Sequence, residues 1–256
     1  MKSLKERLKS GEVTVGSWIT LGHTAIAEMM ATSGFDWLVV DMEHSVITLD
    51  LAQELIRVIQ LCGVTSLVRV GENDPNLIKR VMDAGAGGVI VPMVNTKKDV
   101  IDAVNAVKYP PVGTRGVGLA RAQGYGLRFD AYKKWVNKES VVIVQIEHID
   151  AVRNLDDILG TDGVDAFIVG PYDLSASLGK PGDFESSDFT GALGTIKDLS
   201  VKHSAVPGFH VIPPDARMAA KKIREGYRFI GFSLDTMFLG VKCGKELGDL
   251  RRVIAK

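Results

Sequence analysis

Short apolar segments recur along the chain, and more polar stretches separate them. The segments are rich in valine, isoleucine, leucine and phenylalanine, and most show no regular alternation with polar residues. A short continuous apolar run is typical of a strand that is buried on both faces. We therefore predict eight strands, at residues 13–23, 35–44, 65–71, 87–94, 141–149, 164–170, 207–213 and 227–235.

Most of the segments between these strands carry apolar residues at helical spacing. Gly34 is suited to end one helix, and the turn Asn73-Asp74-Pro75 starts another. A glycine-rich polar insert occupies residues 109–126. The predicted helices are a charged amphipathic opening helix and the segments 24–34, 49–63, 76–85, 97–108, 129–137 and 152–159.

Eight alternations of strand and helix predict an α/β protein of the (β/α)₈ barrel class, folded as a single domain over residues 1–256. An open doubly wound sheet is the structural alternative, because periodicity alone does not prove that a sheet closes. Such a sheet usually has fewer strands and, where it binds a dinucleotide, a GxGxxG turn after the first one. The sequence has no such turn there, which favours the barrel.

Composition and charge narrow the classes of function. The 31 basic and 31 acidic residues cancel, and no block of like charge indicates a nucleic acid or a membrane surface as partner. The opening residues lack the apolar core of a signal peptide, and no apolar run reaches the length of a membrane span. Cys62 and Cys243 lack metal-site or redox spacing, so we expect both to be reduced. We expect a cytoplasmic protein that binds small molecules.

Chemically active side chains gather where the predicted strands end. In (β/α)₈ barrels the active site is built at the C-terminal ends of the strands. Polar residues scattered at random along the chain would not fall at the strand ends so consistently. The residues are Trp18, Asp41, Glu43, His44, Arg69, Glu147, Asp173, His210 and Asp235.

Two carboxylates at successive strand ends suggest a divalent metal site. Glu147 lies near the end of segment 141–149, and Asp173 follows segment 164–170. Neighbouring parallel strands are about 4.8 Å apart, so both acids can reach one point beyond the strand ends. Two carboxylates are too few for Ca²⁺, and no thiolate or histidine cluster favours zinc. Mg²⁺ or Mn²⁺ fits better, with a 2-oxo acid completing the shell. The structural alternative for Asp173 is a helix cap.

Arg69 and His44 are candidate catalytic residues, each with a structural alternative. Arg69 lies in an apolar strand, stays charged and must meet an anion. That anion is either an enolate oxygen that Arg69 stabilises or a barrel carboxylate, Glu43 or Asp41. His44 would shuttle protons if Asp41 orients it. Its alternative is a loop histidine bonded to the backbone.

Two absences narrow the chemistry further. No predicted strand presents an inward lysine at its C-terminal end, which disfavours an aldolase that works through a Schiff base. No GxSxG turn is present, so a serine hydrolase is poorly supported.

Six motifs, in this order, resemble one protein family. They are VGSWITL, GFDWLVVDMEHS, VRVGENDPNLIKRVMDAGAGGVIVPMV, YPPVGTRGVG, VQIEHIDAVRNLDDIL and GVDAFIVGPYDLSASLG. Together they run over nearly the whole chain. On these motifs the sequence resembles the HpcH/HpaI aldolase family, the metal-dependent class II pyruvate aldolases typified by 4-hydroxy-2-oxoheptanedioate aldolase and 2-dehydro-3-deoxyglucarate aldolase.

The resemblance implies a (β/α)₈ barrel that assembles into a homo-hexamer, with a C-terminal helix exchanged between subunits. It implies that Glu147 and Asp173 bind a divalent metal ion, Mg²⁺ or Mn²⁺ with Co²⁺ as a further candidate, and that Arg69 stabilises an enolate. The implied reaction is reversible aldol cleavage of a 4-hydroxy-2-oxo acid, of the 2-keto-3-deoxy sugar acid type, to pyruvate and an aldehyde.

The same resemblance assigns the remaining site residues. It implies that Asp41 and His44 form an acid/base dyad and that Gln145 lines the site. It also implies that the backbone from Pro171 to Asp173 binds the carboxylate of pyruvate. Trp18, at the end of the first strand, is a further candidate substrate-binding residue.

Two departures from the family pattern bear on the substrate. Tyr172 stands where many members have a small residue, so its ring is expected to crowd or reshape the pocket. His210, in FHVIPPDAR, replaces the usual apolar end of the seventh strand, where contacts to the acceptor aldehyde are expected. A packed barrel histidine is the alternative. These departures argue against heptanedioate or glucarate as the substrate.

Three hypotheses of function follow, and the metal-dependent aldolase ranks first. The same residues would support oxaloacetate decarboxylation or cleavage of an acyl-CoA, although no basic groove for a CoA phosphate is evident. A non-catalytic oligomeric binding protein ranks last, because Arg69, Glu147 and Asp173 are all present.

Overall fold

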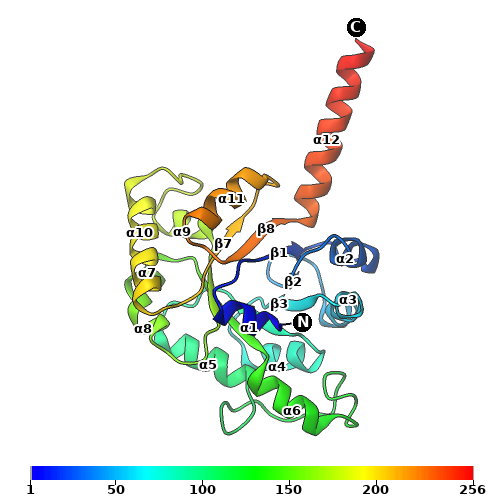
Figure 1. The fold of residues 1–256 in the computed structure, drawn as a ribbon, viewed down its shortest axis with the longest axis vertical. Coiled ribbons are helices and arrows are strands. Elements are labelled where there is room, and N and C mark those ends of the chain that lie inside the picture. Colours follow the sequence, from blue (N-terminus) through cyan, green and yellow to red (C-terminus); the bar gives the residue numbers. More distant parts are fainter. Residues whose placement is uncertain (1, 256) are drawn as a thin grey trace.

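The computed structural model describes residues 2–255, and its eight strands form a closed barrel in the order of the sequence (Figure 1). All neighbouring strands are parallel, and the pairing of the first with the last closes the barrel. The predicted (β/α)₈ barrel is therefore confirmed, and the open sheet is excluded. The strands are β1 (Thr14–Ile19), β2 (Trp37–Asp41), β3 (Thr65–Arg69), β4 (Gly88–Val91), β5 (Val141–Ile146), β6 (Ala166–Val169), β7 (Pro207–Val211) and β8 (Phe229–Leu234).

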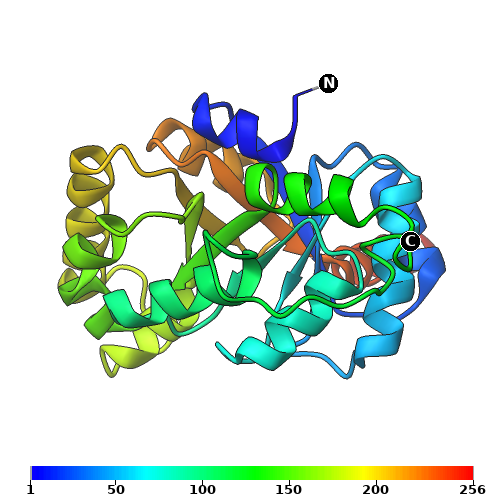
Figure 2. The same cartoon turned by 90° about the horizontal axis from the view of Figure 1, so that it is seen from below.

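Helices follow the strands and cover the outside of the barrel (Figures 1 and 2). The helix predicted at 152–159 is instead two short helices, because the chain breaks at Asn154. The strand predicted at 141–149 ends at Ile146, so Glu147 stands just beyond it. The helices are α1 (Leu4–Lys9), α2 (Thr24–Ala31), α3 (Leu49–Leu61), α4 (Pro75–Asp83), α5 (Lys97–Val107), α6 (Phe129–Lys138), α7 (Ile149–Arg153), α8 (Leu155–Leu159), α9 (Pro171–Ser177), α10 (Ser187–Lys202), α11 (Ala216–Arg224) and α12 (Asp235–Ile254).

Alternate residues of the strands point into the barrel and fill it. On β2, Trp37 and Val39 belong to the buried apolar cluster of the interior, and Leu67 of β3 belongs to the same cluster. Successive side chains of a strand point to opposite faces. Asp41 and Arg69 therefore take the next inward positions on these two strands. The alternation that packs the interior also brings charged side chains to its C-terminal end.

Helix α1, blue in Figure 2, closes the opposite end of the barrel. Leu4 and Leu8 are buried and belong to the interior cluster. Lys5 Nζ lies 2.9 Å from Asp165 Oδ1 and donates to the carbonyl oxygen of Ser140 at 3.2 Å. These contacts fix α1 to the N-terminal ends of β5 and β6. The charged side chains of Asp41 and Arg69 lie at the opposite, C-terminal end of the barrel.

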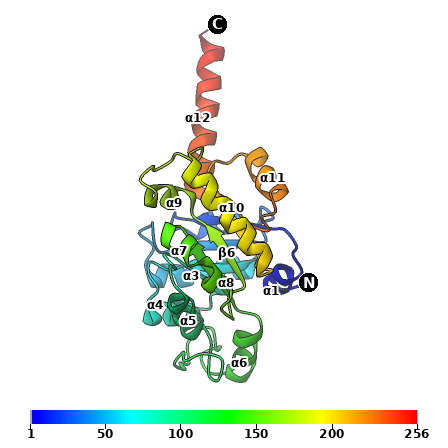
Figure 3. The same cartoon turned by 90° about the vertical axis from the view of Figure 1, so that its left-hand side faces the viewer.

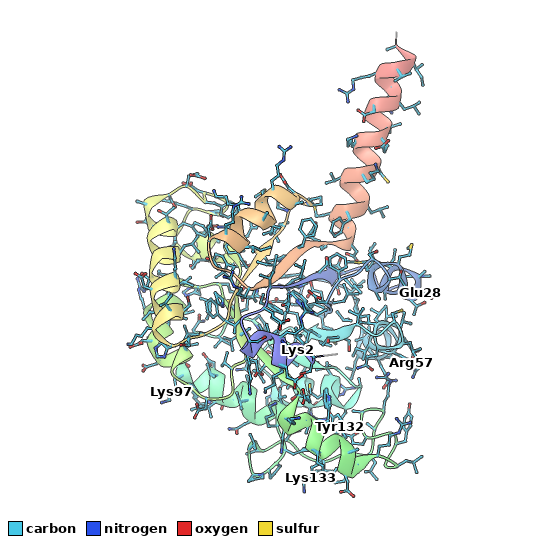
Figure 4. The ribbon with its side chains drawn as sticks, in the orientation of Figure 1. Lys2, Glu28, Arg57, Lys97, Tyr132 and Lys133 are labelled. Atoms are coloured by element: carbon cyan, nitrogen blue, oxygen red, sulfur yellow. The ribbon has the colours of Figure 1, made fainter. Side chains whose placement is uncertain are left out.

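Buried polar contacts hold the glycine-rich insert 109–126 to the barrel. Arg115 Nη2 donates to Asp83 Oδ1 at 2.5 Å, and Nη1 donates to the hydroxyl of Tyr132 at 3.0 Å. Tyr132 lies on α6 (Figure 4). Gln123 Nε2 donates to the hydroxyl of Tyr109 at 2.8 Å. These hydrogen bonds join the insert to α4 and α6 on the outside of the barrel.

Helix α12 extends away from the barrel (Figures 1 and 3). Its exposed residues Leu239, Leu247, Leu250 and Ile254 recur at helical spacing and share one face. An amphipathic helix gains most of its stability by burying such a face. Within this chain the face has no partner among the described residues.

Charged side chains lie on the outer helices. Glu28 of α2 and Lys97 of α5 lie on the outside of the helices (Figure 4). Cys62 and Cys243 are free thiols. None of the helices in residues 2–255 has both the length and the apolarity that crossing a bilayer requires.

Close packing at the start of β4 generates a prediction. A Cβ on Gly88 would lie 2.3 Å from the carbonyl oxygen of Val141 on β5, so the paired strands would have to move apart. We expect Gly88→Ala to lower the free energy of unfolding by about 3 kcal/mol, measured by urea denaturation. Gly191→Ala on α10 is the matched control, because its new Cβ meets no atom within 4 Å. The control should gain up to about 1 kcal/mol from helix propensity. Equal stability of the two variants would contradict this account.

Candidate active site

A cavity of about 250 Å³ opens at the C-terminal ends of the strands. The predicted site residues that line it are Trp18, Asp41, His44, Arg69, Gln145, Pro171, Tyr172, Asp173 and His210. Glu147 is joined to this lining through Gln145, whose Nε2 donates to Glu147 Oε2. The structure therefore brings the predicted residues together around one cavity.

Asp235 is the exception among the strand-end residues. Its buried carboxylate accepts the backbone N–H groups of Thr20 and Leu21 at 2.8 and 2.7 Å. It also accepts the hydroxyl of Thr20 at 2.6 Å. Asp235 therefore fixes the loop after β1 to the start of α12. Both of its carboxylate oxygens accept hydrogen bonds from that loop.

Arg69 and Asp41 form a two-point ion pair inside the barrel. The two residues are register partners on β2 and β3. Arg69 Nε donates to Asp41 Oδ1 at 2.9 Å, and Nη2 donates to Oδ2 at 2.7 Å. Burial lowers the pKa of Arg69, but the hydrogen bonds and charge of Asp41 outweigh it and hold the pKa above its usual value. The guanidinium is therefore charged and fixed in orientation.

The contact predicted between Asp41 and the ring of His44 is not formed among the described residues. Asp41 Oδ1 instead accepts the backbone N–H groups of Glu43 and His44, at 3.1 and 3.4 Å. The imidazole lies at the cavity mouth with its side chain 65% exposed. Arg69 takes the carboxylate of Asp41 because paired strands place the two side by side, whereas His44 lies beyond the end of β2.

Glu43 also lies beside Arg69, as one of the two carboxylates that the sequence offered as its partner. Its Oε2 lies 3.1 Å from Arg69 Nη1 and 3.8 Å from His44 Nε2. The N–H of Arg69 does not point at this oxygen, so the contact is an ion pair and Oε2 has no hydrogen-bond partner among the described residues. Burial raises the pKa of the Glu43 carboxyl to about 7, although Arg69 lowers it. The only sequence signal for Glu43 is its place between Asp41 and His44.

Glu147 is held in place by both of its oxygens. Oε1 accepts the backbone N–H of Met93 at 2.8 Å, and Oε2 accepts Nε2 of Gln145. A Cβ on Gly170 would lie 2.9 Å from Oε2, so this glycine leaves room for the carboxylate. Burial raises the pKa of Glu147, and the charge of Asp173 adds to this effect.

Asp173 lies in the first turn of α9 and lines the cavity. The helix begins after Gly170, and no side chain caps it. Over the described part of the chain, no hydrogen bond to the Asp173 carboxylate is formed. The geometry therefore gives no support to the helix-cap alternative for Asp173.

Trp18 and His210 stack across the cavity wall. Their ring centroids are 4.1 Å apart with an interplanar angle of 16°. Trp18 Nε1 is buried and has no partner among residues 2–255. Burial lowers the pKa of His210 to about 4, so its ring is neutral at physiological pH. The ring of His210 is packed against Trp18 and also lines the cavity.

Tyr172 lies at the rim of the cavity. Its residue is 51% exposed, and its ring packs edge-on against Phe184 with centroids 5.0 Å apart. The ring is therefore held at the mouth of the site by a neighbour on the outer side.

A model of the HpcH/HpaI aldolase/citrate lyase family matches residues 14–240, which include all eight strands and every residue of the site. The chain belongs to this family. The resemblance seen in the six sequence motifs is thereby confirmed.

Relatives within the HpcH/HpaI family are similar over almost the whole chain. The 2-keto-3-deoxy-L-rhamnonate aldolase of Escherichia coli strain K12 is 37% identical over 236 residues, 91% of this chain and 87% of that protein. The crystal structure of an HpcH/HpaI aldolase/citrate lyase family protein from Burkholderia cenocepacia J2315 has a TM-score of 0.92 at 34% identity, covering 97% of this chain and 98% of that one. The citrate synthase SbnG has a TM-score of 0.88 at 28% identity, covering 99% of both chains.

The two carboxylates of this HpcH/HpaI member suit a hard divalent cation. No three histidine, cysteine, aspartate or glutamate side chains in residues 2–255 are grouped as metal ligands. Glu147 and Asp173 therefore offer an incomplete oxygen shell, of the kind that Mg²⁺ completes with water and substrate oxygens. Burial and the charge of Asp173 raise the pKa of Glu147, whereas Asp173 is exposed and its carboxylate accepts no hydrogen bond within residues 2–255. A cation would offset the charge of both carboxylates, so the residues fit the ion.

The pairing of Arg69 with Asp41 generates a prediction about stability. Arg69→Met leaves the Asp41 carboxylate buried and unpaired, so we expect the free energy of unfolding to fall by about 3 to 5 kcal/mol. Asp41→Asn removes that buried charge while keeping an acceptor oxygen. The double variant should recover about half of the loss, measured by urea denaturation in a double-mutant cycle. Strictly additive effects would show that the pair is not coupled.

Proposed function

We propose that this protein is a divalent-metal-dependent aldolase. It reversibly cleaves a 2-keto-3-deoxy sugar acid, or a related 4-hydroxy-2-oxo acid, into pyruvate and an aldehyde. The observation that carries the proposal is that Arg69, Gln145 and Asp173 line one cavity, and that Gln145 holds the carboxylate of Glu147 next to it. The 37% identity with 2-keto-3-deoxy-L-rhamnonate aldolase supports this class of substrate.

Glu147 and Asp173 are the proposed ligands of the metal ion, with Mg²⁺ or Mn²⁺ as the preferred candidates and Co²⁺ as a further one. When bound, such an ion supplies a Lewis acid at the 2-oxo group of the substrate. The hydrogen bonds from Met93 and Gln145 fix the orientation of the Glu147 carboxylate. Each Glu147 oxygen keeps a second lone pair for a ligand.

Arg69 is the proposed stabiliser of the charge that develops on the 2-oxo oxygen as the C3–C4 bond breaks. Asp41 holds two of its donors, and Glu43 lies beside the third nitrogen. A donor that is fixed before reaction costs no reorganisation when charge develops, and loss of one such donor typically costs about 10²- to 10³-fold in rate.

His44 is the proposed proton carrier. It lies at the mouth of the cavity, exposed to solvent, with Glu43 as its nearest carboxylate at 3.8 Å. Cleavage requires that the 4-hydroxyl of the substrate lose a proton, and His44 accepts it directly or through a water molecule. Asp41 contributes by fixing the backbone of His44.

The remaining lining residues are proposed to bind the substrate. The N–H groups of Tyr172 and Asp173, in the first turn of α9 after Pro171, have no partner within the helix and are suited to the pyruvate carboxylate. Gln145 and Trp18 line the same cavity, and Trp18 carries an unused N–H donor.

A second candidate function uses the same residues on another acid. The likeness to a protein named as a citrate synthase, SbnG, favours it. For this chain the candidate would be oxaloacetate decarboxylation or acyl-CoA cleavage. A non-catalytic oligomeric binding protein ranks below both.

Metal-dependent release of pyruvate tests the proposal. Protein stripped with EDTA and given Mg²⁺, Mn²⁺ or Co²⁺ should release pyruvate from at least one of a panel of 4-hydroxy-2-oxo acids, measured by a coupled lactate dehydrogenase assay. The stripped protein should release none. Bound metal without release from any acid in the panel would reject the aldolase and favour the decarboxylase or lyase.

Matched variants separate the roles in that assay. Glu147→Gln and Asp173→Asn should abolish metal binding, measured by calorimetry, whereas Arg69→Lys should bind metal and lose about 10²-fold or more in turnover. Asp157→Asn, an exposed carboxylate on α8, is the control and should behave as wild type.

We also propose that the protein is a homo-oligomer, with a hexamer as the form that the family resemblance implies. The apolar face of α12 supports this, because a second copy of the chain would bury it. Leu247→Glu with Leu250→Glu should give a smaller species in sedimentation velocity, with an unchanged circular dichroism spectrum. Lys245→Glu, on the opposite face of α12, is the control and should not change the mass. A wild-type monomer at micromolar concentration would reject the proposal.

A further inference from the structure

His210 presents one ring nitrogen to the protein and the other to the cavity. It lies on β7, and its Nε2 is 3.2 Å from the carbonyl oxygen of Ser233 on β8. A carbonyl oxygen only accepts hydrogen bonds, so Nε2 carries the proton. Because a neutral imidazole has one donor and one acceptor, Nδ1 is an acceptor.

The surroundings of the ring keep it in this state. Trp18 stacks on one face at 4.1 Å, and burial lowers the pKa of His210 to about 4, so a second proton is not taken up near neutrality. A Cβ on Gly231 would lie 3.1 Å from His210 Cδ2 and 2.5 Å from Trp18 Cζ3. The absence of that Cβ gives both rings their space, and it shows that the Cδ2–Nε2 edge faces β8.

Nδ1 therefore lies on the edge that faces away from β8. Within residues 2–255 no group donates a hydrogen bond to it, and it is not one of the enclosed polar atoms that lack a partner. The ring itself lines the cavity. A donor that reaches Nδ1 must come from the cavity contents.

The position of His210 assigns it to the far end of the substrate. The groups proposed to hold the 2-oxo acid come from β3, from β5 and from the start of α9 after β6. In a barrel with its strands in sequence order, β7 lies opposite β3. The cavity wall beside His210 is apolar, formed by Ile212 and Leu234. Among the lining residues at β7 and β8, His210 is thus the one with a side-chain acceptor.

We infer that His210 selects substrates that carry a hydroxyl on C5, the carbon bonded to C4 on the aldehyde side of the cleaved C3–C4 bond. Nδ1 of His210 accepts a hydrogen bond from that hydroxyl. This inference rests on the proposed aldolase function. A 2-keto-3-deoxy sugar acid carries such a hydroxyl at C5, and its cleavage yields a 2-hydroxyaldehyde. A 4-hydroxy-2-oxo acid with a plain alkyl tail lacks it, and then leaves Nδ1 without a donor.

Two aldehydes that differ by one hydroxyl test the inference in the synthetic direction. With pyruvate and metal, wild-type protein should use lactaldehyde about five- to tenfold better than propanal in kcat/KM, as expected for one neutral hydrogen bond in a water-excluded site. His210→Leu replaces the ring by an apolar group and should lose this preference. His210→Asn restores an acceptor oxygen near the position of Nδ1 and should keep most of it.

The outcomes separate this inference from the proposed function. Activity with both aldehydes and an unchanged lactaldehyde to propanal ratio in His210→Leu would overturn the role of His210 and leave the aldolase in place. Loss of the preference in His210→Leu with retention in His210→Asn would establish the role, because a purely structural ring would affect both aldehydes alike. No product from either aldehyde with wild-type protein and bound metal would overturn the proposed function and this inference together.

Discussion

Arg69 cannot lose its charge inside the barrel, so its guanidinium has to be paired there. Cross-strand register supplies the partner, because Asp41 stands directly beside it on β2. The two hydrogen bonds fix the plane of the guanidinium and place its remaining edge near Glu43. Breaking such a pair exposes a buried charge, whereas keeping it adds little stability over an apolar pair. The pair is therefore better explained by what Arg69 does in the cavity than by the stability of the fold.

Much of this arrangement could be predicted from the sequence, because it follows from strand periodicity. Apolar runs identified the eight strands, and Asp41 and Arg69 were predicted to lie where two neighbouring strands end. The sequence left the partner of Asp41 open between His44 and Arg69. Sequence proximity suggested His44, whereas the carboxylate is taken by Arg69, which lies 28 residues away in sequence. Contacts across strands depend on register, and register depends on the closed barrel.

Glycines are the second feature that sequence analysis could not interpret. Gly170 and Gly231 sit in or beside apolar runs and carry no chemistry, yet a Cβ on either would meet Glu147 or the stacked rings of Trp18 and His210. Their role is to leave space, and this is visible only once the neighbouring strands are in place. Glu43 is similar, because its raised pKa comes from burial rather than from any local motif. The role of a residue that leaves space, or whose pKa is shifted by burial, is difficult to predict from a single sequence.

In the proposed function, the barrel separates the groups that act on the cleaved bond from the wall that contacts the aldehyde. Charged groups on β2 and β3, directly after β5 and at the start of α9 lie around the end where the bond would break, and hydrogen bonds hold the Asp41–Arg69 and Gln145–Glu147 pairs. The wall at β7 and β8 is apolar apart from His210, whose contacts are to Trp18 and to the Ser233 carbonyl. A side chain on that wall can therefore change without unpairing any charge. Substrate preference can then vary among members of the family while the reacting groups stay the same.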